Sequence, residues 1–278
     1  MIRLPVVGVL LLLLCLGGWT TPPPAHARDD AQDWLYISRP GETLQDIGER
    51  FLAPDHAWLD LMHYNGLADP FVLAPGTELS IPVAWLAQRS EPAILQTVSG
   101  KVWIRRAQRQ DYQPATPGAV VQVGDEVKTG AGAATLRFAD GSETDIAATT
   151  RLVINRMTRF GRSGMLDIRW RLLEGGAENR VSPVQQPAGR HEVTTPGAVA
   201  AVRGTVFRLH ADGPRTRAEV IEGSVELRNG GALALLQAGE GTTNAEGGIL
   251  VQTLPEPPPL QVASRVEAVP LVVRWEPV

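Results

Sequence analysis

Residues 34–82 read WLYISRPGETLQDIGERFLAPDHAWLDLMHYNGLADPFVLAPGTELSIP, and this stretch decides the fold of the first part of the chain. Bulky, strand-prone residues open it, and the turn at residues 39–42 ends that strand. Apolar residues then recur at helical spacing between residues 44 and 51 and again between residues 58 and 62. Apolar alternation at residues 79–81 closes the stretch as a strand. The pattern predicts a small two-layer strand–helix–helix–strand unit.

Residues at the ends of these elements support the same reading. Thr43 is predicted to cap the first helix, and Asp46 three residues later completes a capping box. The pair Asn65–Gly66 predicts a helix end in the left-handed conformation. The pair Pro75–Gly76 predicts a type II turn before the last strand.

Three short motifs in this stretch, PGETL, YNGL and APGTELSIP, resemble the LysM domain in their order and spacing. The resemblance covers residues 33–83 and implies binding of N-acetylglucosamine chains, as in peptidoglycan, in a shallow groove between two loops. Backbone groups in such loops can bind the acetamido group, while apolar side chains cover the sugar face. The glycan-binding residues that the resemblance implies are Gly41, Glu42, Thr43, Leu44, Leu67, Ala68, Asp69, Pro70, Phe71 and Val72.

The first 27 residues are typical of a secretory signal peptide. Arg3 supplies the positive start, residues 6–16 the apolar run, and Ala25-His26-Ala27 a cleavage site. The alternative is an uncleaved anchor, although the apolar run is short for a membrane span. The single cysteine lies in this segment, so the mature chain is predicted to lack disulfides and thiolate chemistry. We expect export to the periplasm of a Gram-negative bacterium, in association with the cell wall.

Residues 84–93 are predicted as a linker, and residues 94–251 as a larger all-β domain. Short strand-like runs alternate there with turn residues, and Asp140–Gly141 is a strong hairpin signal. Ser99–Gly100 is interpreted as a turn between two strands. A weak repeat of apolar pair, glycine turn and alternating strand favours a β-roll or β-helix-like form. The predicted fold class is therefore α+β.

The runs VSGKVWIRR, VGDEVKTGAGAATLRFADGSETDI, TTPGAVAAVRGTVFRL and VIEGSVEL resemble the FecR domain of bacterial periplasmic proteins. In the namesake family this domain relays a signal from an outer-membrane receptor to a sigma factor through a cytoplasmic N-terminal segment. This chain departs there, because a signal peptide stands at its N-terminus. The resemblance therefore implies a periplasmic β-scaffold with an envelope protein as partner.

Residues 252–278 are predicted as a Pro-rich linker and the start of further β structure. The run Pro-Glu-Pro-Pro-Pro is stiff and extended, and Leu271–Val278 reads as a strand. That strand either pairs with an edge of the β domain or opens a further domain, and the sequence leaves both open.

The sequence predicts no enzyme, no cofactor and no metal. His56 and His63 are seven residues apart, roughly 10 Å along a helix, which is too far for one ion. Glu42 lacks a second carboxylate placed as a glycosidase requires. Asp140, Glu143 and Asp145 are interpreted as solvated turn residues, and His191 as a surface or strand residue. The net charge of −4 argues against a nucleic-acid partner.

Three functions compete on this sequence. The first is a non-catalytic envelope protein that binds peptidoglycan and presents the β domain as a scaffold or partner-binding surface. The second is a periplasmic sensor or signalling relay of FecR type, which the LysM-like module only positions. The third is a peptidoglycan hydrolase or its accessory, against which the missing catalytic groups argue. The scaffold is the preferred hypothesis, and the oligomeric state stays open.

Overall fold

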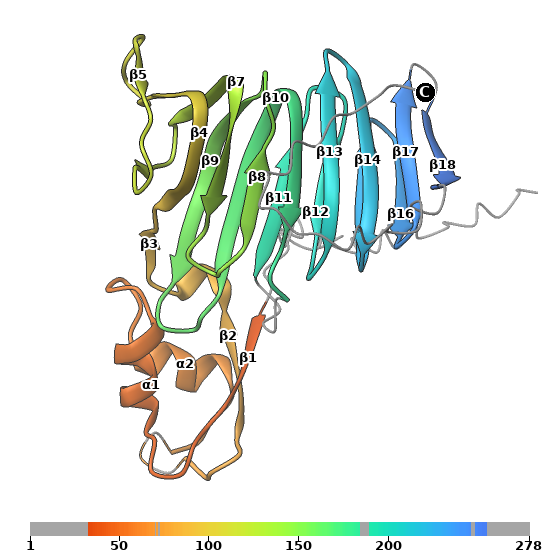
Figure 1. The fold of residues 1–278 in the computed structure, drawn as a ribbon. Helices are drawn as coiled ribbons and strands as arrows, with labels where there is room; N and C mark the ends of the chain where they lie inside the picture. Colours follow the sequence, from red (N-terminus) through yellow and green to blue (C-terminus); the bar gives the residue numbers. More distant parts are fainter. Residues whose placement is uncertain (1–32, 70, 72, 184–188, 246–247, 255–278) are drawn as a thin grey trace, which may run out of the picture. The chain divides into compact units, whose positions relative to one another are not determined.

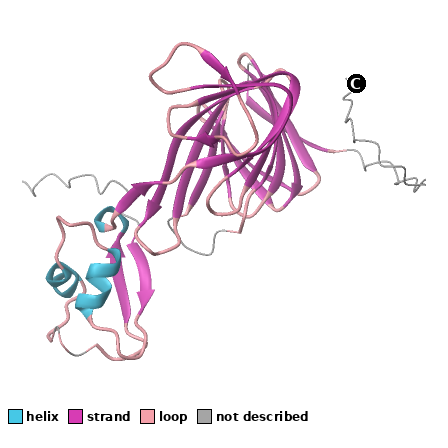
Figure 2. Ribbon diagram, turned by 60° about the vertical axis from the view of Figure 1, so that its left-hand side comes forward, coloured by secondary structure: helices cyan, strands magenta, loops and turns pink. Residues whose placement is uncertain are grey.

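The computed structural model describes residues 33–69, 71, 73–183, 189–245 and 248–254. The predicted signal peptide and the residues from 255 onward lie outside the described residues. Helices are confined to the first part of the described chain, and strands make up most of the remainder (Figure 2). The predicted α+β class, a small β-α-α-β unit followed by a mostly β region, is confirmed.

The first module consists of β1 (Asp33–Ile37), α1 (Leu44–Phe51), α2 (Trp58–Tyr64) and β2 (Glu78–Pro82) (Figure 1). Its two strands form an antiparallel sheet in which Trp34 lies opposite Ile81. The two helices and this sheet enclose a core that contains fully buried Leu44, Leu61 and Leu79. The predicted order of four elements is thus the observed one.

Local chemistry sets the ends of the helices and their separation. The Asp46 N–H donates to Thr43 Oγ1 (3.1 Å) and the Thr43 N–H donates to Asp46 Oδ2 (3.0 Å), which is the predicted capping box. Gly66 has φ +64° just after α2, as the Asn65–Gly66 pair predicts. A Cβ on Gly48 would stand 2.6 Å from Trp58 Cβ, so glycine lets α1 and α2 pack closely.

Residues 84–93, the predicted linker, belong to ordered structure. They include the last two residues of the 3₁₀ turn η1 (Val83–Trp85), all of β3 (Gln88–Ser90) and the first residue of β4 (Ala93–Arg105). β3 pairs antiparallel with β9 (Arg151–Phe160). Phe160 and Met165 are also buried in the same apolar cluster as the core of the first module. The end of β9 and the turn that follows it therefore complete the core of the first module.

Four strands of the β region form a closed ring. β7 (Glu126–Arg137) pairs with β8 (Glu143–Ile146), β8 with β10 (Leu166–Arg180), β10 with β9, and β9 with β7. β4 adds to the outside of β7, and the short strands β5 (Tyr112–Pro114) and β6 (Val120–Val121) pair with β4. Ring closure gives a small barrel core within the larger sheet.

The long strand β10 connects this ring to the remaining strands. Residues up to Glu174 pair with β9, and those up to Arg171 also pair in parallel with β11 (Arg190–Thr194). From Gly175 onward the strand pairs with β13 (Val206–Asp212) and then also with β8. The change of partners falls at Gly175, which has φ +85°, a conformation that favours glycine. From β10 the order of paired strands continues in two branches, one through β11 and one through β13.

One direction leads through β11 to β12 (Val199–Val202), β15 (Ser224–Asn229) and the edge strand β16 (Ala232–Gln237). The other leads through β13 to β14 (Arg215–Glu222), β17 (Glu240–Ala245) and the edge strand β18 (Gly248–Thr253). One apolar cluster that includes Trp170 and Phe207 runs through the whole β region.

Turns were predicted at two glycines in this region, and only one of the two is observed. The Asp140–Gly141 hairpin is confirmed, since Gly141 has φ +84° between β7 and β8. The turn at Ser99–Gly100 is wrong, because β4 runs through it as one strand. Gly100 has φ +68° and lies at a register shift against β7, so its glycine marks a bulge and not a chain reversal.

Candidate glycan groove in the first module

The two loops that the sequence assigns to the groove lie at one end of the first module (Figure 1). Ser38, just before the first loop, binds the residues that follow the second. Its N–H donates to the Thr77 carbonyl (3.0 Å), its hydroxyl donates to the Ala74 carbonyl (2.8 Å), and its carbonyl accepts from the Gly76 N–H (2.9 Å). These three hydrogen bonds hold the two loops together.

The first loop uses its charged side chain internally. The Glu42 carboxylate accepts hydrogen bonds from the Tyr36 hydroxyl (2.7 Å), the Arg39 N–H (2.8 Å) and Arg50 Nη1 (2.5 Å). Burial alone would raise the pKa of Glu42, but these donors outweigh it and lower the pKa to about 2. Glu42 is therefore an ionised residue that shapes the loop, and it has no character of a general acid.

The other residues of the first loop divide between core and surface. Leu44 is fully buried beneath the loop, whereas Gly41 and Thr43 are exposed. Gly41 has φ +81°, and a Cβ placed on it would meet no atom within 4 Å, so its backbone is open to an approaching ligand. The Thr43 hydroxyl oxygen accepts the hydrogen bond from the Asp46 N–H that caps α1.

The second loop exposes a large aromatic ring. Leu67 is half-buried against the core of the module, while Ala68 and Asp69 are exposed. Asp69 Oδ1 accepts from the Phe71 N–H (2.8 Å) in a local turn. Phe71 is 82% exposed, which is unusual for a side chain of this size. The predicted residues Pro70 and Val72 lie outside the described residues.

Trp58 is a neighbour of this loop that the sequence interpretation assigned only to the helix core. It is half-buried at the start of α2, and its ring centroid lies 6.5 Å from that of Phe71 at an angle of 56°. Aromatic rings at such an angle and distance attract one another. The sequence feature that could have indicated this contact is the position of Trp58, an aromatic residue at the start of the helix nearest the second loop.

The two loops thus offer turn backbone and apolar rings, and their two acids, Glu42 and Asp69, already accept hydrogen bonds from within the module. Such a surface suits an uncharged, amide-rich ligand. Among the described residues, no group of three or more His, Cys, Asp or Glu side chains could hold a metal ion. His56 and His63 line a separate hollow on α2, described below.

Other residues singled out in the sequence lie in the β region. His191 is a strand residue of β11, one of the two alternatives given above, and it is not at the surface: it is 2% exposed, and its Nε2 accepts from Trp170 Nε1 (3.2 Å). Asp145 is paired with Arg180 (2.5 Å), and Asp140 accepts from the Ser142 N–H and hydroxyl. These acids stabilise the hairpin and its neighbouring strand.

Comparison with known families agrees with both parts of the chain. Residues 36–82 match the LysM domain, and residues 125–226 match the FecR protein family. The chain therefore carries a LysM domain, of a peptidoglycan-binding family, followed by a FecR domain. Domains of these two kinds are typically non-catalytic.

The similar proteins cover the chain only in part. An uncharacterised protein of Deinococcus radiodurans is 32% identical over 54 residues, which is 19% of this chain and 21% of that protein. The chain thus spans about a fifth of the length of that relative. Two crystal structures of a proposed anti-sigma factor from Parabacteroides distasonis are 19% and 21% identical, each covering 46% of this chain and 59% of theirs with a TM-score of 0.39.

Within the described residues, none of the helices has the length and apolar character that a membrane crossing requires.

Proposed function

We propose that this protein is a non-catalytic component of the bacterial envelope that binds N-acetylglucosamine-containing glycan, peptidoglycan above all, through its LysM domain. The observation that carries the proposal is the pair of loops joined by Ser38, in the second of which Phe71 is 82% exposed, more than any other large apolar side chain among the described residues. Turn backbone joined by hydrogen bonds and an exposed ring together suit an acetamido sugar, whose amide can bind backbone groups while its apolar face covers the ring.

The proposal assigns a role to each part of the chain. Residues 33–83 form the glycan-binding module and residues 94–251 form a β-scaffold that presents a surface to an envelope protein. The ten residues predicted for the groove remain the proposed contacts, with Glu42 and Leu44 acting through the shape of the loop. Residues 1–27 direct export to the periplasm.

The FecR match supports a second function. In the namesake family the FecR domain relays a signal to a protein partner. By that resemblance, the β region is a sensor or relay that the LysM domain holds near the wall. The two functions differ in what carries the activity: glycan binding in the first, and a protein contact of the β region in the second.

Co-sedimentation with purified peptidoglycan sacculi tests the proposal. We expect the chain from Arg28 onward to pellet with sacculi and to be released by soluble N-acetylglucosamine oligomers. Phe71→Ala should reduce the pelleted fraction at least fivefold at limiting sacculi, because it removes the exposed ring. Leu59→Ala, which alters another exposed apolar side chain of the module, is the matched control and should pellet as the parent does.

Absence of pelleting by the parent protein would contradict the proposal and favour the relay function. Equal losses in Phe71→Ala and Leu59→Ala would show that binding does not pass through the groove.

A further inference from the structure

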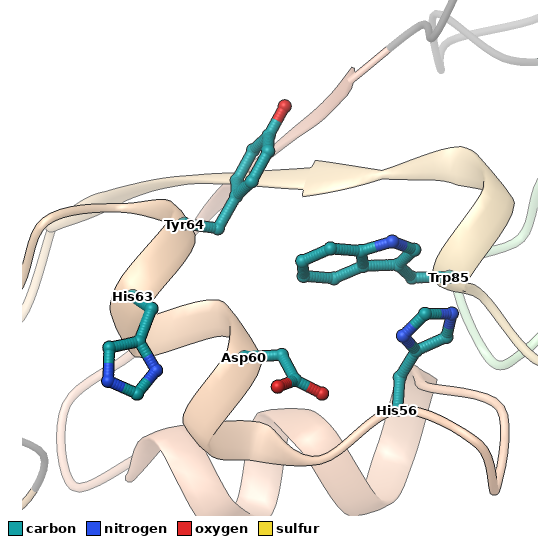
Figure 3. A pocket seen from close by; sticks show the side chains of 5 residues that line it. All are labelled: His56, Asp60, His63, Tyr64 and Trp85. Carbon is teal, nitrogen blue, oxygen red and sulfur yellow. The ribbon is translucent and has the colours of Figure 1, made fainter.

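The first module has a concave surface on α2. Five side chains border it: His56, Asp60, His63, Tyr64 and Trp85 (Figure 3). They come from the segment before α2, from α2 itself and from η1. The hollow measures roughly 520 Å³ and is open to solvent. None of its residues belongs to the two groove loops.

The aromatic wall of this hollow is held in place by its own contacts. The His56 ring stacks on Trp85 with centroids 4.8 Å apart and an angle of 20°. Tyr64 meets Trp85 at 5.2 Å and 62°. The Trp85 carbonyl accepts from the Ala53 N–H (2.8 Å), which fixes η1 against the segment between the helices. Tyr64 is nevertheless 47% exposed, so part of this ring surface is open to a ligand.

The polar side of the hollow contains one carboxylate and two imidazoles. Asp60 Oδ2 accepts from the Ala57 N–H (2.7 Å) at the start of α2. Its second oxygen, Oδ1, accepts no hydrogen bond from any described residue. His63 is exposed, and no Lys or Arg lines the hollow. Anionic ligands are therefore disfavoured, whereas a neutral ligand rich in hydroxyl or amide donors is suited.

We propose that this hollow is a second saccharide site, which takes an N-acetylhexosamine ring of the same class of glycan. A pyranose ring presents an apolar C–H face, which would lie against Tyr64 and Trp85, and hydroxyl donors, which would reach Asp60 Oδ1. An aromatic wall with a few fixed polar groups is the usual composition of a small-ligand site. This inference rests on the proposed glycan-binding function.

Two sites on one small module have a consequence for affinity. A polymeric glycan can occupy both, so the second contact forms at a high effective concentration and strengthens binding without any change in the groove. A short oligosaccharide fills one site at a time and gains little. The ratio of affinities for sacculi and for a tetramer therefore reports on the hollow.

NMR titration with the N-acetylglucosamine tetramer tests both sites in one sample of the chain from Arg28 onward. The Trp85 indole N–H reports on the hollow, and the Phe71 backbone N–H reports on the groove. We expect both signals to shift. In Tyr64→Ala and in Asp60→Asn, where Asn retains the acceptor at the start of α2, the Trp85 shift should fall at least fivefold and the Phe71 shift should stay.

Co-sedimentation with sacculi tests the same two variants of the hollow. Tyr64→Ala and Asp60→Asn should each weaken pelleting five- to tenfold, while Leu59→Ala on the same helix leaves it unchanged. Thermal melts of all variants within about 2 °C of the parent would show that the module is intact.

The two proposals fail differently. If Phe71 shifts and Trp85 does not, the hollow is not a saccharide site and glycan binding stands. If Trp85 shifts equally in the parent and in both hollow variants, the assignment of Tyr64 and Asp60 is overturned. If neither signal moves and sacculi do not pellet the protein, both proposals are refuted together.

Discussion

A buried carboxylate at the start of β7 gives a sharp prediction about the stability of the β region. Glu126 is 1% exposed and accepts hydrogen bonds from the Tyr112 hydroxyl (2.5 Å), Arg151 Nε (2.7 Å) and Arg105 Nη2. Its partners lie on β5, β9 and β4, so one side chain links four strands. The substitution Glu126→Gln keeps the shape and removes the charge.

The expected loss follows from the pKa of this group. Burial alone would raise the pKa of Glu126, but hydrogen bonds from Arg151, Tyr112 and Arg105 outweigh it and lower the pKa from 4.5 to about 2. The pKa of Glu126 thus differs by about 2.5 between the unfolded and folded states, and at 1.36 kcal/mol per pKa unit this corresponds to about 3 kcal/mol of stabilisation at pH 7. For a domain of this size that corresponds to a fall in Tm of roughly 6–12 °C.

The pH dependence supplies a second readout. Because the folded pKa is depressed, the stabilisation is fully present above about pH 4.5 and is lost as pH falls toward 2. The difference between the parent and Glu126→Gln should therefore be largest near pH 7 and shrink below pH 4.5. Urea denaturation at several pH values, followed by circular dichroism, measures both quantities.

Glu174→Gln is the matched control. That carboxylate lies 3.7 Å from the same Arg151, but its side chain is 50% exposed, so its loss should cost less than about 0.5 kcal/mol. A loss below 1 kcal/mol in Glu126→Gln, or a difference that stays constant from pH 7 to 3, would refute the reasoning.

Three further predictions concern other parts of the fold. Burial lowers the pKa of His191 to about 4, although the nearby charge of Asp140 acts in the opposite direction. The free energy of unfolding should therefore be highest above pH 6.5 and fall by about 3 kcal/mol as the pH drops toward 4. Urea melts of His191→Gln should lack this fall. Gly48→Ala should destabilise the first module by about 1–3 kcal/mol and weaken sacculi binding, since its Cβ meets Trp58 at 2.6 Å, and unaltered thermal melts would contradict that. Leu236→Ala should cost about 2–5 kcal/mol, whereas adjacent Leu235→Ala, with 58% exposure, should cost less than about 0.5 kcal/mol; equal losses would mean that the face assignment of β16 is incorrect.

Local signals predicted the first module well because each acts over a few residues. The capping box at Thr43 and the left-handed Gly66 depend only on neighbouring backbone groups, and both are observed. The same reasoning failed at Gly100, where a positive φ is compatible with a turn or with a bulge. Only the partner strand β7 decides between these, and it lies some thirty residues further along the chain.

Long-range features were beyond the reach of sequence periodicity. The closed ring of β7, β8, β10 and β9 depends on pairings between distant segments, which alternation within a strand does not encode. The candidate site shows the same division. The turns of the two loops were predictable, but the internal use of Glu42 by Arg50 and the nearness of Trp58 to Phe71 require the packed helices.

The placement of Phe160 and Met165 in the core of the first module has a mechanical consequence. When a domain is joined to its neighbour by a flexible linker, a pulling force extends the linker before it acts on the neighbouring domain. Here β3 is hydrogen-bonded to β9, and removal of the end of β9 and the turn that follows it would open the core of the module. If the LysM domain binds glycan as proposed, tension on the bound strand is expected to pass into the β9 ladder as shear. A single cooperative transition in calorimetry, in place of two, would be the thermal counterpart of this shared core.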